Sequence, residues 1–134
     1  MRFLKSVLSA ALLFAGAFAA KKSPTERFDE FHRKSQSAAP LKLTETSYKS
    51  LTSAPRDYSA AVLLTALETR FGCQLCQEFQ PEYELLAKSW TKGDAAADSR
   101  MLFGTLDFVA GRDVFVSVRF PSLLSVNMDA HNGV

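Results

Sequence analysis

The strongest restriction on the fold comes from two cysteines that follow an apolar segment and open a helical pattern. Tyr58–Leu67 contains the almost wholly apolar run Ala60–Leu67, and its short length after a turn predicts a strand buried on both faces; a buried helix is the alternative. Across Cys73–Trp90 the apolar residues recur at helical spacing and predict one continuous apolar face. Its members are Cys76, Phe79, Tyr83, Leu86 and Trp90. Pro81 lies inside this helix and predicts a kink, because proline lacks the N–H of a helical hydrogen bond.

Strand and helix patterns alternate through the rest of the chain. Phe28 and Phe31 lie three residues apart after a cap at Ser23 or Thr25, which predicts an amphipathic helix that lies on the domain; a docking helix is the alternative. Ser35–Pro40 is expected to be a linker. The other predicted elements are strands at Leu41–Leu43 and Met101–Phe108, a helix from Thr44 to Leu51, a loop at Thr91–Arg100, and either a strand or a short helix at Gly111–Arg119. This order predicts an α/β domain with βαβ units.

The N-terminal residues have the features of a secretory signal peptide. Arg2 and Lys5 precede the uncharged segment Ser6–Ala20, and Ala17-Phe18-Ala19 provides the small residues of a cleavage site. A membrane anchor is the alternative, but the segment is shorter than the roughly 20 residues that a spanning helix needs. No apolar stretch of that length follows residue 20. We therefore expect a signal peptide at 1–20, a helix and linker at 21–40 and the folded domain at 41–134.

Cleavage of the signal changes the charge of the protein. Residues 1–20 contain Arg2 and Lys5 and no acid, so the formal net charge falls from +2 to zero. A neutral domain lacks the basic surface with which proteins bind nucleic acid or anionic lipid. Nucleic acid is therefore excluded from the expected partners.

The spacing of the two cysteines predicts thiol–disulfide exchange. A cysteine at a helix N-terminus faces unpaired backbone N–H groups and the positive end of the helix dipole, which favour the thiolate. Cys73 is therefore the candidate attacking thiol, and Cys76, one turn later, is the more buried resolving thiol. Gln74 and Leu75 lie between them and are expected to tune the redox potential.

Three other interpretations of the cysteines compete with redox chemistry. A zinc site needs about four ligands, and the available histidines, His32 and His131, lack the usual spacing. A structural disulfide would close a very small loop and stabilise the fold little. Two unpaired cysteines fit poorly with the oxidising compartment that a signal peptide implies. The position after a buried strand and before an amphipathic helix favours redox chemistry.

The segment Cys73–Tyr83, CQLCQEFQPEY, resembles the thioredoxin-like lumenal domain of the gamma-type oligosaccharyltransferase subunits. Phe103–Phe108 and Gly111–Phe115 are similar to later blocks of that family, and the resemblance spans about residues 25–119. General thioredoxins carry Trp before the first cysteine and Gly-Pro or Gly-His between the pair, where this chain has Gly72 and Gln-Leu. The resemblance implies a thioredoxin-like fold, with a mixed, mostly parallel sheet flanked by helices and incomplete at the C-terminus.

The resemblance also implies a role in asparagine-linked glycosylation in the lumen of the endoplasmic reticulum. Such a subunit holds a nascent polypeptide through a transient mixed disulfide, or in a groove beside the cysteines, while another subunit transfers the sugar. Carried over to this chain, Cys73 forms the mixed disulfide, Cys76 resolves it, and Gln74, Leu75 and Pro121 are candidates for the groove. The implied partners are cysteine-containing nascent polypeptides and the other oligosaccharyltransferase subunits; no cofactor or metal is implied.

The C-terminal residues depart from the family. Its members continue into four transmembrane helices, so membrane association is expected only through helices beyond Val134. A cis-proline of the family faces the cysteines shortly after the position of Arg119, and Pro121 lies a few residues early. Either Pro121 takes that role or the chain is truncated or mistranslated after about Arg119; residues 119–134 are therefore expected to form an atypical tail.

Two further functions stay open. The same cysteines suit a free-standing lumenal oxidoreductase or isomerase that has no fixed partner complex. A non-enzymatic peptide-binding or adaptor domain, in which the disulfide is incidental, is the third hypothesis.

Overall fold

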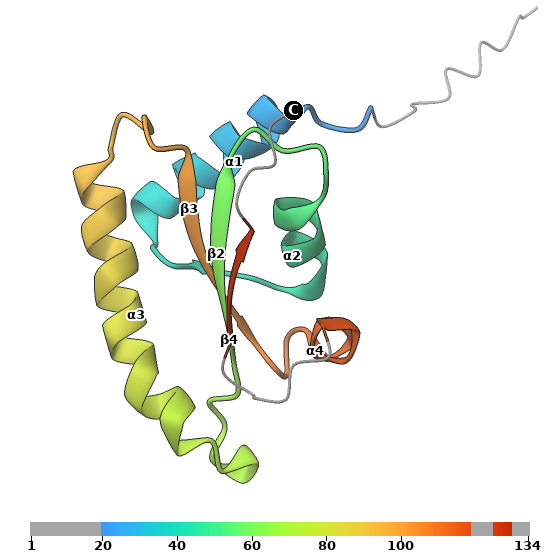
Figure 1. Ribbon diagram of the computed structural model, residues 1–134, viewed down its shortest axis with the longest axis vertical. Helices are drawn as coiled ribbons and strands as arrows, with labels where there is room; N and C mark the ends of the chain where they lie inside the picture. Colours follow the sequence, from blue (N-terminus) through green and yellow to red (C-terminus); the bar gives the residue numbers. More distant parts are fainter. Residues whose placement is uncertain (1–19, 119–124, 130–134) are drawn as a thin grey trace, which may run out of the picture.

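The computed structural model describes residues 20–118 and 125–129. In chain order the elements are α1 (Pro24–Ser37), β1 (Leu41–Lys42), α2 (Glu45–Thr52), β2 (Ser59–Thr65), the 3-10 helix η1 (Thr69–Phe71), α3 (Gln74–Gly93), β3 (Met101–Asp107), α4 (Arg112–Val118) and β4 (Ser125–Asp129). They form one four-stranded sheet in the order β1-β3-β2-β4, flanked by helices (Figure 1). β1, β3 and β2 run parallel, and β4 pairs antiparallel with β2. The prediction of an α/β fold with a mixed, mostly parallel sheet is confirmed.

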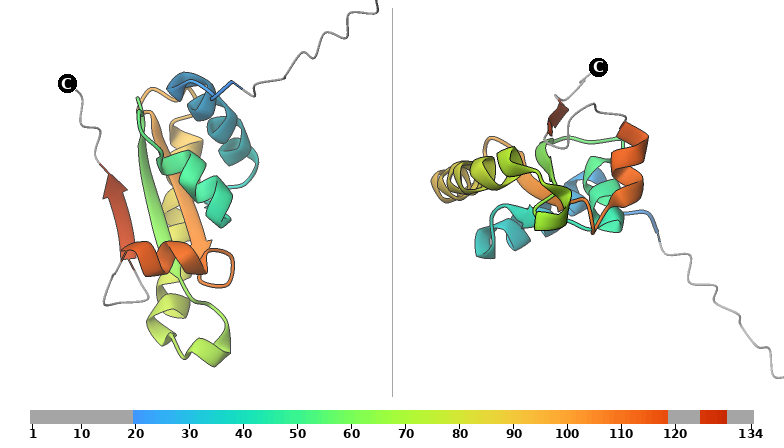
Figure 2. Two further views of the ribbon diagram at one scale, coloured as in Figure 1. Left: turned by 90° about the vertical axis from the view of Figure 1, so that its right-hand side faces the viewer. Right: turned by 90° about the horizontal axis from the view of Figure 1, so that it is seen from below.

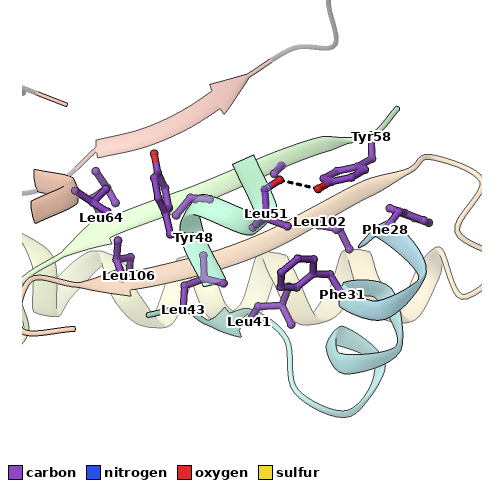
Figure 3. Packing of buried hydrophobic residues seen from close by; sticks show 13 residues of the cluster. Phe28, Phe31, Leu41, Leu43, Tyr48, Leu51, Tyr58, Leu64, Leu102 and Leu106 are labelled. Atoms are coloured by element: carbon purple, nitrogen blue, oxygen red, sulfur yellow. Dashed lines mark hydrogen bonds between the residues drawn. The ribbon is translucent and has the colours of Figure 1, made fainter. Parts of the chain in front are cut away.

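The helices cover the two faces of the sheet unequally (Figure 2). α3 packs on one face, where Tyr83 and Ala87 meet Ala61, Leu63 and Phe103. The other face carries a larger apolar cluster, to which α1, α2 and α4 all contribute. Figure 3 shows this cluster, including the hydrogen bond from the Tyr58 hydroxyl to the backbone carbonyl of Leu51.

Local sequence signals account for where the first two helices begin. α1 starts with a capping box, in which Ser23 and Glu26 each accept a hydrogen bond from the other's backbone N–H. Thr44 and Ser47 form the same arrangement at α2. Of the two caps expected for α1, the structure uses Ser23. The prediction of a linker over 35–40 is wrong at its start, because α1 continues to Ser37.

α1 packs against the domain through its predicted apolar face. Phe28 and Phe31 are buried in the larger cluster. The neighbouring Arg27 is also buried, and its guanidinium donates to the Ser50 carbonyl, the Ser53 hydroxyl and the Pro55 carbonyl. α1 is thus tied to the end of α2, which matches the interpretation as a helix lying on the domain rather than the docking alternative.

The strand expected at 58–67 is β2, and its central residues are buried on both faces. The ambiguous segment after Gly111 is the helix α4, not a strand.

α3 runs through Pro81 and ends at Gly93, inside the segment expected to be a loop. Its predicted apolar face is only partly buried. Cys76 and Tyr83 are covered, whereas the three other members of that face are 37–52% exposed: Phe79, Leu86 and Trp90.

Some expectations fall outside the described residues. These are the signal peptide up to residue 19, Pro121, and His131. The tail at 119–134 contributes β4, whose backbone adds a strand beside β2. Among the helices of the described residues, none has both the length and the hydropathy required to cross a membrane.

Candidate active site

A short connection that contains one residue in the left-handed region, Gly72, places Cys73 at the start of α3. After β2 the chain forms η1, and Gly72 then adopts a φ of 59°, a conformation that favours glycine. The Gly72 N–H bonds to the Thr69 carbonyl at 3.0 Å. Cys73 follows as the N-cap residue of α3. The sequence therefore turns from sheet to helix with the first cysteine at the helix N-terminus.

The two cysteines form a disulfide and differ in exposure. Cys73 and Cys76 are bonded, with their Cα atoms 5.3 Å apart. Cys76 is 0% exposed, whereas Cys73 is partly exposed. Of the two cysteines, Cys73 is therefore the one with surface open to solvent.

The N-terminus of α3 presents hydrogen-bond donors to the Cys73 sulfur. The backbone N–H of Cys76 donates to Cys73 Sγ at 3.2 Å. The first turn of α3 contains no acidic residue that would offset the positive end of the helix dipole. Both features favour negative charge on Cys73 Sγ, which is the charge that this sulfur carries as a thiolate once the disulfide is reduced.

The two residues between the cysteines lie at the surface. Leu75 is exposed and the Gln74 side chain donates to Glu78 Oε1 at 2.7 Å, so neither is part of the core. Farther along the helix, the Gln77 side chain donates to the Leu67 carbonyl at 3.4 Å, which links α3 to the loop before the cysteines.

Aromatic packing supports the loop before Cys73, and the sequence analysis missed it. The rings of Phe71 and Phe108 meet edge to face at 5.1 Å, and Phe108 meets Phe115 in the same way at 5.2 Å. The Arg112 guanidinium lies over Phe108, 5.4 Å from the ring centre. These contacts join η1, the end of β3 and α4. The only signal in the sequence was the apolar character of each residue, which does not reveal contacts between segments so far apart.

Polar contacts fix the ends of the strands beneath the cysteines. Asp107 Oδ2 accepts from the Leu67 N–H at 2.9 Å, and the Phe108 N–H donates to the Thr65 carbonyl at 2.8 Å.

Tyr83, in the middle of α3, bonds the helix to the sheet. Its buried hydroxyl lies 2.8 Å from the backbone carbonyl oxygens of both Ala61 and Gly104. Burial raises the pKa of this phenol, so it stays protonated as a hydrogen-bond donor.

The described residues contain no cluster of His, Cys, Asp or Glu able to hold a metal ion. His32 instead stacks on Phe28 at 5.5 Å and exchanges a hydrogen bond with Gln36 at 3.0 Å. Of the predicted site residues, the structure brings together Cys73, Cys76, Gln74 and Leu75; the structure does not describe Pro121.

Comparison with known proteins places this chain in a family. Residues 28–126 match the family model described as "OST3 / OST6 family, transporter family". The chain belongs to the OST3/OST6 family. Three relatives bear the name dolichyl-diphosphooligosaccharide–protein glycosyltransferase subunit MAGT1. The zebrafish (Danio rerio) protein is 38% identical over 58% of this chain, the Xenopus laevis protein 41% over 47%, and the human protein 39% over 46%. These matches cover 24%, 19% and 18% of the relatives' own lengths.

The fold is similar to that of a solved thioredoxin. Spinach chloroplast thioredoxin f superposes with a TM-score of 0.53 over 75% of each chain, at 13% sequence identity. At that identity the similarity concerns the fold alone. The OST3/OST6 chain thus has a thioredoxin-like fold, as the resemblance implied.

Proposed function

We propose that this domain is the thiol–disulfide exchange module of an accessory subunit of the oligosaccharyltransferase, on the lumenal side of the endoplasmic reticulum. It holds a cysteine-containing polypeptide through a mixed disulfide with Cys73 and releases it through Cys76. The supporting observation is the bridge between Cys73 and Cys76 at the N-terminus of α3, with the first cysteine partly exposed and the second buried. Membership of the OST3/OST6 family supports the setting in asparagine-linked glycosylation.

Capture starts from the oxidised state, in which Cys73 and Cys76 are joined by the disulfide. A thiolate of the polypeptide attacks Cys73 Sγ, a sulfur–sulfur bond forms between polypeptide and Cys73, and the Cys73–Cys76 bond breaks. Cys76 leaves as a thiolate and takes a proton from solvent. Attack at this sulfur is favoured because Cys76 is covered and cannot be approached from outside.

Release is the reverse exchange. Cys76, deprotonated, attacks Cys73 Sγ in the mixed disulfide; the intramolecular bond forms again and the polypeptide leaves as a thiolate. No net oxidation or reduction takes place over the cycle, so no external oxidant is consumed. A polypeptide held in this way has its cysteine occupied, which delays its oxidative folding and keeps nearby acceptor asparagines accessible to the sugar-transferring subunit.

A trapping experiment tests the role of each sulfur. The full chain carrying Cys76→Ser is reduced and mixed with a peptide whose cysteine is joined to glutathione. Cys73 displaces glutathione and forms a mixed disulfide that has no resolving thiol, so a covalent adduct should accumulate on a non-reducing gel. The matched Cys73→Ser variant should form far less adduct, because its remaining thiol is buried. Equal trapping by both variants, or none by Cys76→Ser, contradicts the proposed division of roles.

The setting is tested separately from the chemistry. A thioredoxin-like fold also suits a free-standing lumenal oxidoreductase, and the family match favours the complex-bound subunit. Expressed in place of the cell's own family members, the protein should co-purify with the oligosaccharyltransferase, and Cys73→Ser should lower occupancy at a subset of acceptor asparagines. Normal site occupancy together with slowed disulfide formation would instead favour the free-standing oxidoreductase.

A further inference from the structure

One side of α3 carries a row of exposed apolar side chains, although the helix covers a face of the sheet. Four of its large apolar residues are 37–57% exposed: Leu75, Phe79, Leu86 and Trp90. At 3.6 residues per turn they fall within an arc of about 60°, so they form one continuous row, the α3 stripe. α3 lies at one side of the molecule, away from α2 and α4 (Figure 1). Contiguous exposed apolar surface of this kind is typical of interaction sites.

The α3 stripe has the same spacing when the helix is read in reverse. Its four residues are separated by 4, 7 and 4 positions, which is symmetric about the middle of the stripe. Two copies of α3 packed antiparallel therefore place Leu75 of each copy against Trp90 of the other. The same packing places Phe79 of each copy against Leu86 of the other. This self-complementarity is what a twofold interface requires, because the same surface serves on both copies.

We propose that the α3 stripe is a homodimer interface, in which the α3 helices of two copies of this chain pack antiparallel around a twofold axis. Burial of the leucine and aromatic side chains, which are exposed in the single chain, provides the driving force. The interface uses no sulfur atom of the Cys73–Cys76 bridge, so it goes beyond the proposed exchange function and does not depend on it.

The length of the α3 stripe sets the strength of the dimer. From Leu75 to Trp90 the helix rises about 22 Å, at about 1.5 Å per residue, and a helix is about 10 Å wide. A contact of that size buries less than the about 1,200 Å² of total surface that is typical of stable complexes. The dimer is therefore weak, and we expect a dissociation constant between about 10 µM and about 1 mM.

Glu82 makes the antiparallel arrangement testable. This exposed residue lies beside the middle of the α3 stripe, so the antiparallel pair brings Glu82 of the two copies close together at the twofold axis. The two like charges repel each other, and salt screens that repulsion. Dimerisation should therefore become stronger as the salt concentration rises. At low salt, Glu82→Gln should lower the dissociation constant by about twofold, because the repulsion is removed.

The fluorescence of Trp90 reports on the interface at a single residue. Trp90 is the only tryptophan in the sequence, and it belongs to the α3 stripe. The full chain, expressed through a secretory pathway, is titrated from about 1 µM to about 1 mM. As the dimer forms, the emission should shift to shorter wavelengths, with the same midpoint as the dimerisation measured by sedimentation velocity. A chain that stays monomeric over this range, or an association that leaves the emission unchanged, overturns the proposal.

Two matched variants separate the α3 stripe from general adhesion. Leu86→Glu should raise the dissociation constant at least about tenfold, because each copy loses the burial of one leucine. Its thermal midpoint should stay near that of the wild type, since Leu86 is half-exposed in the single chain. Val116→Glu adds the same charge at an exposed residue of α4, on the other face of the sheet, and should dimerise normally. Equal dimerisation by these two variants, or a weaker dimer in Glu82→Gln, contradicts the proposed interface.

Disulfide exchange between copies is another route to a dimer, and a reducing agent distinguishes the two. Reduction of the Cys73–Cys76 bridge should leave the dissociation constant unchanged, and a non-reducing gel of the untreated dimer should show single chains. An association that the reducing agent abolishes overturns the proposal. Under reducing conditions Cys73→Ser should dimerise like the wild type. A variant that dimerises normally but traps little peptide would therefore separate this proposal from the proposed function.

Discussion

Replacement of Tyr83 by phenylalanine removes the polar contact that holds α3 on the sheet. The hydroxyl lies 2.8 Å from the carbonyl oxygens of Ala61 in β2 and Gly104 in β3. It has one proton, so the two contacts amount to one shared hydrogen bond rather than two. A buried hydrogen bond contributes about 1–1.5 kcal/mol to the free energy of unfolding. We expect Tyr83→Phe to cost about that amount.

The comparison variant is Tyr58→Phe. The Tyr58 hydroxyl is also buried and donates to a single acceptor, the Leu51 carbonyl, at 2.7 Å. Because each tyrosine contributes one proton, both variants should lose similar stability in urea unfolding at neutral pH. The thermal midpoint should fall by about 5–10 °C in each case. A loss for Tyr83→Phe of twice that for Tyr58→Phe, or no loss at all, refutes the one-proton reasoning.

Alkaline pH provides a second test of Tyr83. Burial raises the pKa of this phenol, so the folded protein holds the proton more tightly than the unfolded chain does. Its stabilising contribution is complete below the unfolded value of about 10 and is lost as the pH rises above it. Tyr83→Phe lacks the titrating group. Its free energy of unfolding should therefore fall less steeply than that of the wild type between about pH 9 and 11.

Three further predictions concern other parts of the chain. Gly72→Ala must keep a φ of 59° and should cost about 1–2 kcal/mol in urea unfolding, while Gly72→Asn should cost less. In Gly104→Ala the new Cβ would stand 2.7 Å from Leu43 Cδ1, so we expect a loss of about 1–3 kcal/mol. Leu43→Ala removes the clashing atom, so the double variant should lose less stability than the two single variants added together. Hydrogen bonds from Lys22 and Lys34 lower the pKa of Glu30 to about 2, so its contribution is present above about pH 4.5 and is lost as the pH falls toward 2. The effect should be below about 1 kcal/mol, because the pairs are exposed, and absent in Glu30→Gln.

Local patterns predicted much of the fold. The capped starts of α1 and α2, the buried strand β2 and the helix after Cys73 depend on neighbouring residues and on spacings of one or two turns. The segment after Gly111 was ambiguous because its β-branched residues favour a strand. Tertiary context decided it, since Val114 is buried in the cluster shared with α2.

The apolar face of α3 shows where periodicity is not enough. The spacing grouped Phe79, Leu86 and Trp90 with Tyr83, but the sheet covers Tyr83 fully and leaves the other three partly exposed. A helix contacts a flat sheet along a narrow line, so only part of a wide apolar face is buried. Which part is set by the placement of the helix, a long-range property.

The sequence alone determined the spacing of the cysteines: a two-residue gap at the start of a helix puts both sulfurs within one turn, whatever the rest of the chain does. The sequence also predicted that Cys76 is the more buried of the two, but only the tertiary structure decided that Phe71, Phe108 and Phe115 meet beside the loop that leads to Cys73. The reason is physical. Bond geometry and helical spacing act between near neighbours, whereas burial and convergence depend on which distant segments pack together.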